Sequence, residues 1–158
     1  MKIVLQRVSS ASVKVDSNVV GKIDHGMLLL IGFSSSDTEE SILPTLEKIV
    51  KLRIFSDEEG KMNKSILDVN GSALLVSQFT LYADTRKGNR PSFIEAARPE
   101  QAIPLYEFFI AEMKKQIAKV ETGIFGADMK VELVNDGPVT IVLDRKSTRL
   151  NSSHTVIS

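Results

Sequence analysis

The chain has 158 residues, with 20 Lys and Arg against 20 Asp and Glu, so its formal net charge is zero. Its composition, 42% apolar and 25% charged, is ordinary for a soluble globular protein, and the length suits one domain better than two. The balanced charge argues against nucleic-acid binding through a bulk positive field, and the absence of cysteine excludes disulfides, thiolate metal sites and thiol nucleophiles.

Metal and membrane chemistry are also disfavoured. The two histidines, His25 and His154, are too few for a multi-histidine metal site, so no metal is expected. The longest apolar run, 27–31, is far too short to cross a membrane, and the first residues lack the apolar core of a secretory signal. The sequence therefore predicts a soluble protein of the cytoplasm.

Four short strands are predicted in the first third of the chain, at 2–8, 11–16, 19–24 and 27–33. The stretch 11–16 alternates apolar and polar residues, as a half-buried strand does. The continuous apolar run 27–31 indicates a strand that is buried on both faces.

Two helices are predicted. Asp37 and Glu40 resemble a capping box, so the first helix would begin with Asp37 as its N-cap. Pro44 falls inside this helix, so the helix either starts later or bends there. The second helix is expected to begin at Pro99, in the N1 position, and it too has an internal proline, Pro104.

The remaining strands set the fold class. Residues 73–76 are predicted to form a buried strand, and 129–134 and 139–143 a strand pair around a turn. Strands separated by two helices without βαβ alternation indicate an α+β fold with a mostly antiparallel sheet or barrel. One domain is assigned to residues 1–145. The Ser/Thr-rich stretch 146–158 is interpreted as a non-native, vector- or adapter-derived tail, with a natural disordered tail as the alternative.

Two segments could carry chemistry, although the common nucleophile-elbow, P-loop and zinc-protease motifs are absent. Residues 77–81 place two hydroxyls and an amide at the end of a buried strand, where they can face a ligand or an oxyanion. Alternatively, Phe79 and Leu81 face the core and the hydroxyls satisfy nearby backbone groups. Residues 135–140 form either a hairpin turn or a site with a cis bond between Gly137 and Pro138.

A third segment, 86–93, is basic and contains an aromatic residue, Phe93. Its cations Arg86, Lys87 and Arg90 either belong to a solvated loop or contact phosphates beside a stacked base. From the residues alone, a non-catalytic RNA-binding module is therefore one hypothesis.

Six phrases of the sequence point to a known family. They are QRV (6–8), RIFSDEEGKMN (53–63), SQFTL (77–81), RPSF (90–93), TGIFGADM (122–129) and NDGPVT (135–140). Through them the chain resembles the D-aminoacyl-tRNA deacylases of bacteria and eukaryotes, from Met1 to about Arg145. The combination of SQFTL with NxGPxT is highly specific for that family.

The resemblance implies an enzyme that hydrolyses the ester between a D-amino acid, or glycine, and the terminal adenosine of tRNA. It implies the fold of that family, a homodimer with shared active sites, the acceptor end of D-aminoacyl-tRNA as partner, and no membrane or DNA partner. No metal and no organic cofactor is needed. Attack by water, assisted by the 2′-hydroxyl of the tRNA, is favoured over a Thr80 nucleophile, because no base to activate Thr80 is visible.

The resemblance also assigns roles to individual residues. The catalytic wall around the ester is expected to consist of Ser77, Gln78, Phe79 and Thr80, with backbone N–H groups near Phe79 facing the oxyanion. Gly137 and Pro138, as a cis pair inserted into the partner's pocket, would reject L-amino acids. The supporting residues are Arg7, which holds that pair, Phe125 and Met129 beside the pocket, and Arg86, Lys87 and Arg90 as tRNA contacts.

Overall fold

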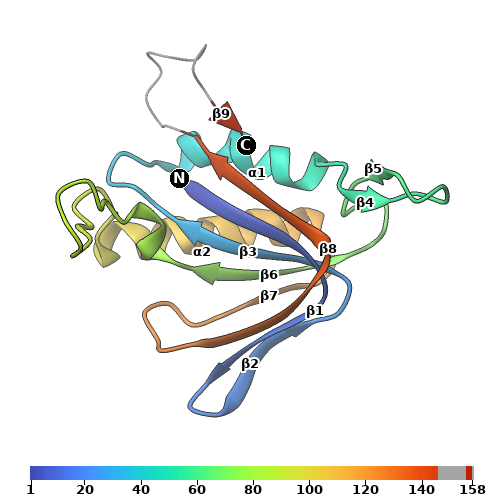
Figure 1. Cartoon of the computed structure of the whole chain (residues 1–158), viewed down its shortest axis with the longest axis horizontal. Helices are drawn as coiled ribbons and strands as arrows, with labels where there is room; N and C mark the ends of the chain where they lie inside the picture. Colours follow the sequence, from blue (N-terminus) through green and yellow to red (C-terminus); the bar gives the residue numbers. More distant parts are fainter. Residues whose placement is uncertain (146–155, 158) are drawn as a thin grey trace.

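The computed structural model describes residues 1–145 and 156–157, and it consists of a strongly twisted sheet with two helices on one face (Figure 1). The elements in chain order are β1 (Lys2–Val15), β2 (Asn18–Ile23), β3 (Gly26–Gly32), α1 (Glu39–Lys51), β4 (Phe55–Ser56), β5 (Met62–Lys64), β6 (Ser72–Ser77), the 3₁₀ helix η1 (Phe79–Tyr82), α2 (Pro99–Gln116), β7 (Val120–Thr122), β8 (Lys130–Asp144) and β9 (Val156–Ile157). Most of the predicted tail, 146–158, lies outside the described residues; the backbone of β9 pairs with the end of β8.

The main sheet has the strand order β7-β6-β3-β1-β8-β9, with β2 paired to β1. The pairs of β1 with β2, β3 and β8 are antiparallel, which confirms the predicted α+β class. The pairs β3–β6 and β6–β7 are parallel, however, and each helix connects two of these strands. The prediction that βαβ alternation is absent was therefore wrong. The unit β6–α2–β7 was missed because β7 has only three residues and carries almost no sequence signal. The elements β3, α1 and β6 of the other unit were predicted, but their parallel pairing was not.

β1 is one strand where two were predicted, at 2–8 and 11–16. Along the strand, the buried side chains change from one face of the sheet to the other. Ile3 and Leu5 belong to the core under the helices, and the residues that belong to a second core on the opposite face are Val8, Ala11 and Val13. The register against β8 shifts between Gln6 and Val8 and again between Val8 and Ser10. Bulges bend a strand and increase its twist, so a single bent strand serves both cores.

β8 is likewise one strand, where a pair at 129–134 and 139–143 was predicted. Both halves pair with β1 in one antiparallel ladder, in which the short stretch from Gln6 to Val8 faces the whole segment 135–140. The residues between Asn135 and Thr140 therefore bulge out of the ladder instead of reversing the chain. β1 continues on both sides of the bulge and holds the two halves in line.

The first helix begins one residue later than its capping pattern predicted. Thr38 is the N-cap: its Oγ1 accepts from the N–H of Ser41 at 3.1 Å, while the Ser41 hydroxyl accepts from the N–H of Thr38 at 2.9 Å. The second helix begins with Pro99 at N1, as predicted. Pro44 and Pro104 are exposed residues in the second turn of their helices, and each helix tolerates the loss of one backbone N–H there. None of the helices in the described part of the chain is long and apolar enough to cross a membrane.

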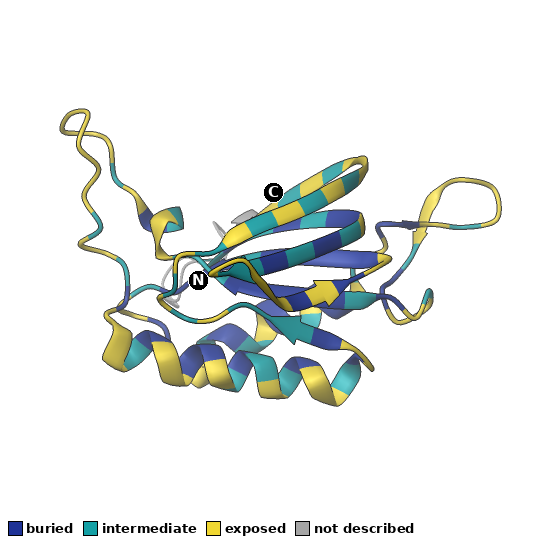
Figure 2. Cartoon of the chain, turned by 90° about the horizontal axis from the view of Figure 1, so that it is seen from below, coloured by how far each residue is buried: buried dark blue, intermediate teal, exposed yellow. Residues whose placement is uncertain are grey.

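The two cores occupy opposite faces of the sheet. Both helices lie on the same side of the sheet (Figure 2), and their buried residues belong to one core. These residues include Ile42, Leu46, Ile49, Val50, Ala102, Leu105, Phe109 and Met113. On the other face, the curled ends of β1, β2 and β8 enclose the smaller core. The partly buried Met129 and Val131 lie at the rim of this smaller core, next to the cavity described below.

Asp37, the predicted cap, is instead part of a buried ion pair. Its carboxylate lies 2.9 Å from the Met1 ammonium group, and both side chains are only 2% exposed. The same ammonium group donates to the Arg145 carbonyl at 3.3 Å, and the Ser34 N–H donates to Asp37 at 2.8 Å. The pair thus links the start of β1, the α1 entry and the end of β8.

We expect Asp37→Asn to lower the free energy of unfolding by about 3 kcal/mol, because removing one partner leaves a buried charge uncompensated. Urea unfolding measures the change. Glu40→Gln, on the exposed first turn of α1, is the control and should stay within about 0.5 kcal/mol of the parent. An unchanged urea midpoint for Asp37→Asn would contradict a stabilising pair.

Candidate active site

A cavity of about 610 Å³ opens where β6 ends and η1 begins. It is lined by 76–80, by Phe93 and 96–99, and by 125–129 from the connection between β7 and β8. The structure thus brings the predicted wall, Ser77 to Thr80, together with Phe125 and Met129, which lie far away in the sequence. The two segments meet because β7 and β6 are neighbours in the sheet.

The turn from β6 into η1 leaves two backbone donors on residues that line this cavity, Phe79 and Thr80. Since η1 begins at Phe79 and its first bond runs from the Leu81 N–H to the Gln78 carbonyl, the N–H groups of Phe79 and Thr80 have no acceptor within the helix. The Gln78 side chain donates to Thr80 Oγ1 at 2.9 Å and orients that hydroxyl. This is a local arrangement of donors suited to a developing negative charge.

Aromatic rings form the rim of the cavity. Phe79 is 55% exposed, so the alternative in which it faces the core was wrong. Its ring meets that of Phe93 edge-on, with centroids 5.1 Å apart. Phe125 is backed by Tyr106 of α2, whose hydroxyl donates to the Leu75 carbonyl at 2.8 Å and whose pKa is raised by burial. Tyr106 therefore stays neutral and fixes the wall behind Phe125.

Sequence reasoning did not assign Phe93 or Arg98 to this cavity. The sequence pattern marks Phe93 only as part of the basic segment, and it does not mark Arg98 at all. Arg98 is the N-cap residue of α2, has no side-chain capping bond, and its side chain is 84% exposed. The signal that could have pointed to Arg98 was the N1 proline, Pro99. It marks the N-terminus of α2, and this end of the helix lines the cavity.

Gly137 and Pro138 do not line this cavity in their own chain. They lie in the exposed bulge of β8, and the peptide bond between them is cis. Asn135 closes the bulge, because its Oδ1 accepts from the Val139 N–H at 2.7 Å and its Nδ2 donates to the Thr140 hydroxyl at 3.0 Å.

A buried arginine holds the bulge from beneath. Arg7 is 9% exposed, and its Nε donates to the Asp136 carbonyl at 2.7 Å. Its Nη1 donates to the Ile54 carbonyl, also at 2.7 Å. The planar guanidinium therefore ties the residue before Gly137 to the segment that leads into β4, and fixes where the bulge projects.

The basic segment lies on the loop between η1 and α2, at the same end of the molecule as the cavity (Figure 1). Arg86, Lys87 and Arg90 are exposed. Arg86 forms a two-pronged ion pair with Asp84, at 2.9 and 2.7 Å, which lowers the pKa of Asp84 to about 2. A carboxylate with so low a pKa is a poor general base at neutral pH.

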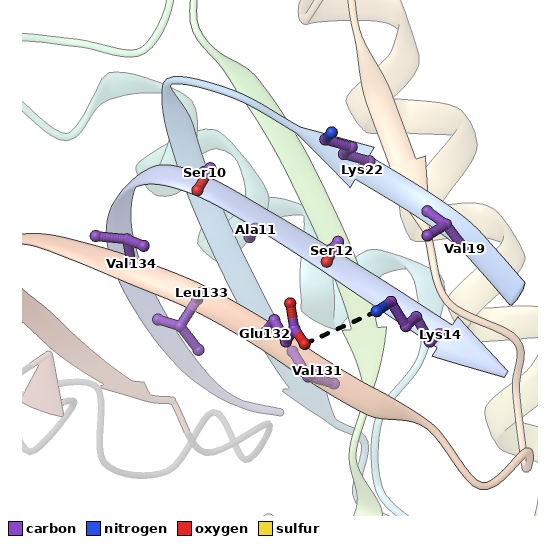
Figure 3. A pocket seen from close by; sticks show the side chains of 10 residues that line it. All are labelled: Ser10, Ala11, Ser12, Lys14, Val19, Lys22, Val131, Glu132, Leu133 and Val134. Atoms are coloured by element: carbon purple, nitrogen blue, oxygen red, sulfur yellow. Dashed lines mark ion pairs between the residues drawn. The ribbon is translucent and has the colours of Figure 1, made fainter. Parts of the chain in front are cut away.

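A second cavity, of about 760 Å³, lies against β1, β2 and β8 (Figure 3). Lys14 and Glu132 face each other across it at 3.9 Å, and Ser10, Ser12 and Lys22 add polar groups. No histidine lines it. The cavity at η1 is the better candidate for chemistry, because it combines an aromatic rim with the two backbone N–H groups that η1 leaves without an acceptor within the helix.

Comparison with known proteins gives one family. The family model described as D-Tyr-tRNA(Tyr) deacylase matches residues 4–144. A protein of Flavobacterium psychrophilum named D-aminoacyl-tRNA deacylase is 55% identical over 148 residues, covering 93% of this chain and 99% of its own. A protein of the same name from Clostridium botulinum is 57% identical over 148 residues, covering 94% and 99%.

Two solved structures are similar in fold. One, described as a c-Myc DNA unwinding element binding protein, superposes with a TM-score of 0.88 at 42% identity, covering 92% of this chain and 99% of that one. Another, described as a probable eukaryotic D-amino acid tRNA deacylase, gives a TM-score of 0.78 at 18% identity, covering 89% and 97%. At that identity the second likeness shows the fold alone.

Proposed function

This chain belongs to the D-Tyr-tRNA(Tyr) deacylase family, and from that premise we propose that it hydrolyses the ester between a D-amino acid and the terminal adenosine of tRNA. The products are the free D-amino acid and the tRNA. The observation that carries the proposal is the cavity in which Ser77 to Thr80, with two N–H donors left unpaired within η1, face Phe125 and Met129. Glycyl-tRNA is a second substrate, because glycine has no side chain that the site must reject.

The site favours attack by water. Thr80 Oγ1 accepts a hydrogen bond from Gln78, and no histidine lines the cavity. The carboxylate that does line it, Asp128, is 88% exposed and paired with Lys130 at 3.3 Å, so it is a poor candidate for the base that a Thr80 nucleophile would need. The N–H groups of Phe79 and Thr80 stabilise the oxyanion as the water adds to the ester carbonyl. The neighbouring 2′-hydroxyl of the tRNA assists proton transfer to the leaving oxygen.

Chiral selection in this proposal comes from a second copy of the chain. Gly137 and Pro138 are exposed and lie outside their own cavity, so a homodimer supplies them to the cavity of the partner. Their backbone carbonyls face the amino group of the substrate, and an L-side chain collides with the same backbone. Selectivity then arises from rejection of the wrong isomer as well as from attraction of the right one.

The basic loop is the proposed contact for the acceptor end of the tRNA. Arg86, Lys87 and Arg90 are exposed and lie on the connection between η1 and α2, and both of these helices contribute residues to the cavity. A few local cations suffice to position phosphates, which agrees with a chain of zero net charge.

Removal of D-amino acids from tRNA is a form of translation quality control, and we therefore propose that the enzyme works in the cytoplasm. A non-catalytic RNA-binding module is less well supported, since the relatives are named as deacylases.

The proposal is tested by the release of tyrosine from D- and L-tyrosyl-tRNA. We expect hydrolysis of the D-ester to be at least 100-fold faster. Thr80→Val should keep kcat/KM for the D-ester within about threefold, because the nucleophile is water and the backbone donors remain. Equal rates on both isomers would overturn chiral selection, and an inactive Thr80→Val protein that is still folded would reinstate a side-chain nucleophile.

A further inference from the structure

A third cavity, of about 720 Å³, lies at the opposite end of η1 from the candidate active site. Its walls are the start of β1, the loop 34–36, the segment 82–86, Glu95 and the end of β8 at 144–145. We propose that this cavity binds the penultimate cytidine of the tRNA, the nucleotide next to the terminal adenosine. The inference rests on the proposed function and extends it to a second nucleotide.

The position of the cavity suits a neighbouring nucleotide. η1 has four residues, so at ~2 Å rise per residue its ends are roughly 8 Å apart. One stacked nucleotide step is ~3.4 Å along the strand, and an unstacked step is longer, as in the splayed single strands that proteins recognise. A strand whose last sugar lies at Phe79 can therefore place the preceding base beyond Tyr82.

The walls of the cavity are held in place before any ligand binds. The Ser35 N–H donates to the Glu95 carbonyl at 3.0 Å, and Asp84 pairs with Ser92 through two backbone bonds of 2.8 and 2.9 Å. Below them, the buried pair of Met1 and Asp37 fixes the loop that carries the serines. A preformed wall lowers the entropic cost of ordering side chains on binding.

The charges that line the cavity match a cytidylate better than a simple anion. Lys2 and Arg145 have no ion-pair partner among the described residues, whereas Arg86, which is 83% exposed at the rim, is paired with Asp84. These cations suit phosphates. The carboxylates of Glu95 and Asp144, also without ion-pair partners in the described part of the chain, would repel a bare anion but accept a hydrogen bond from an exocyclic amine.

Cytosine carries that amine at N4, and a carboxylate is its usual acceptor. Uracil has a carbonyl oxygen at the same position, which faces a carboxylate unfavourably. Tyr82 lines the cavity together with both carboxylates, and Lys2 Nζ lies 4.8 Å from its ring centroid. Burial raises the pKa of Tyr82, and both carboxylates contribute to the same shift. The cavity therefore distinguishes the two pyrimidines by one functional group.

The test compares three D-tyrosyl esters: full tRNA, the same tRNA with the penultimate cytidine changed to uridine, and adenosine alone. With the parent protein we expect the uridine change to lower kcat/KM at least tenfold. In the double variant Glu95→Ala/Asp144→Ala the two tRNAs should react at the same, lowered rate. The adenosine ester should be hydrolysed equally by parent and variant, and Glu107→Gln, an exposed carboxylate of α2 outside the three cavities described above, should behave as the parent does.

The outcomes separate this inference from the proposed function. If the parent protein does not hydrolyse even full D-tyrosyl-tRNA, the proposed function fails. If it does, but cytidine and uridine tRNAs react alike, or the double variant still distinguishes them, the cytidine site is wrong. A readout without catalysis is NMR titration: cytidine 5′-monophosphate should shift the backbone amides of Tyr82 and Glu95 more than uridine 5′-monophosphate, and equal shifts would overturn the proposal.

Discussion

An Arg7→Met protein is expected to hydrolyse D-tyrosyl-tRNA about 100-fold more slowly in kcat/KM than its parent. Methionine fills much of the same buried space but removes the donors to the Asp136 and Ile54 carbonyls, which lie 2.7 Å from the guanidinium. The bulge that carries Gly137 and Pro138 then loses its anchor, and a displacement of ~1 Å at a reacting centre can cost about 100-fold. Discrimination against the L-ester should fall as well.

The control for this change is Asp136→Ala. Arg7 binds the backbone carbonyl of Asp136, while the carboxylate is half-exposed and 3.8 Å away. Loss of that side chain should therefore leave the rates of hydrolysis of the D-ester and of the L-ester within about threefold of those of the parent. Arg7→Lys keeps the charge but not the planar fork, so an intermediate rate is expected. Circular dichroism at the assay temperature verifies that each variant is folded.

A mixture of two defective proteins tests whether the bulge acts on the partner. Arg7→Met impairs the bulge, whereas Phe79→Pro impairs the cavity by removing one of the two backbone N–H donors at the start of η1. If each site uses the cavity of one subunit and the bulge of the other, every mixed dimer has one intact site. Random mixing should then restore roughly one quarter of the parent activity, since half of the dimers are mixed. No recovery above the two separate variants would show that each chain works alone.

Gly26→Ala is expected to be the most destabilising single methyl addition in the sheet, lowering the free energy of unfolding by roughly 4 kcal/mol or more. A Cβ at this position would lie 1.8 Å from the Ser72 carbonyl oxygen and 2.7 Å from its carbonyl carbon. Gly26 and Ser72 are paired residues of β3 and β6, so the clash lies within the central parallel ladder. Relief requires the two strands to separate at this end.

Thermal unfolding should show this loss as a decrease of roughly 8–16 °C in Tm. Gly60→Ala is the control, because nothing lies within 4 Å of its Cβ and only its left-handed backbone, with φ +79°, is strained, at about 1–2 kcal/mol. Ser72→Gly should not rescue Gly26→Ala, since the clashing atom belongs to the backbone. A Gly26→Ala protein within 1 kcal/mol of its parent would contradict so close an approach of the two strands.

Local patterns in the sequence predicted local structure well. The apolar run at 27–31 marked β3, the strand at the centre of the sheet, and the N1 proline marked the start of α2. They failed where a distant segment competed for the same residue. Asp37 had the spacing of a helix cap, but its carboxylate forms an ion pair with the Met1 ammonium group, and Thr38 is the N-cap instead.

The same distinction between local pattern and distant contact applies to the candidate site. The sequence by itself could single out 77–81 and 135–140 as candidate segments, because they carry the residue combinations on which the family resemblance rests. Only the tertiary structure decided that 77–80 and 125–129 share a cavity, since their contact depends on the parallel pairing of β6 with the three-residue β7.

Tertiary structure also decided that the segment 135–140 is a bulge. Asn–Asp–Gly–Pro suits a hairpin turn as well as a bulge, and local preferences do not distinguish the two. The continuous partner β1, and Arg7 placed beneath the segment by the bend of that strand, settle the geometry. A residue pattern limits the backbone conformations that a segment can adopt. Which of these conformations forms depends on the partners that the whole fold brings within hydrogen-bonding distance.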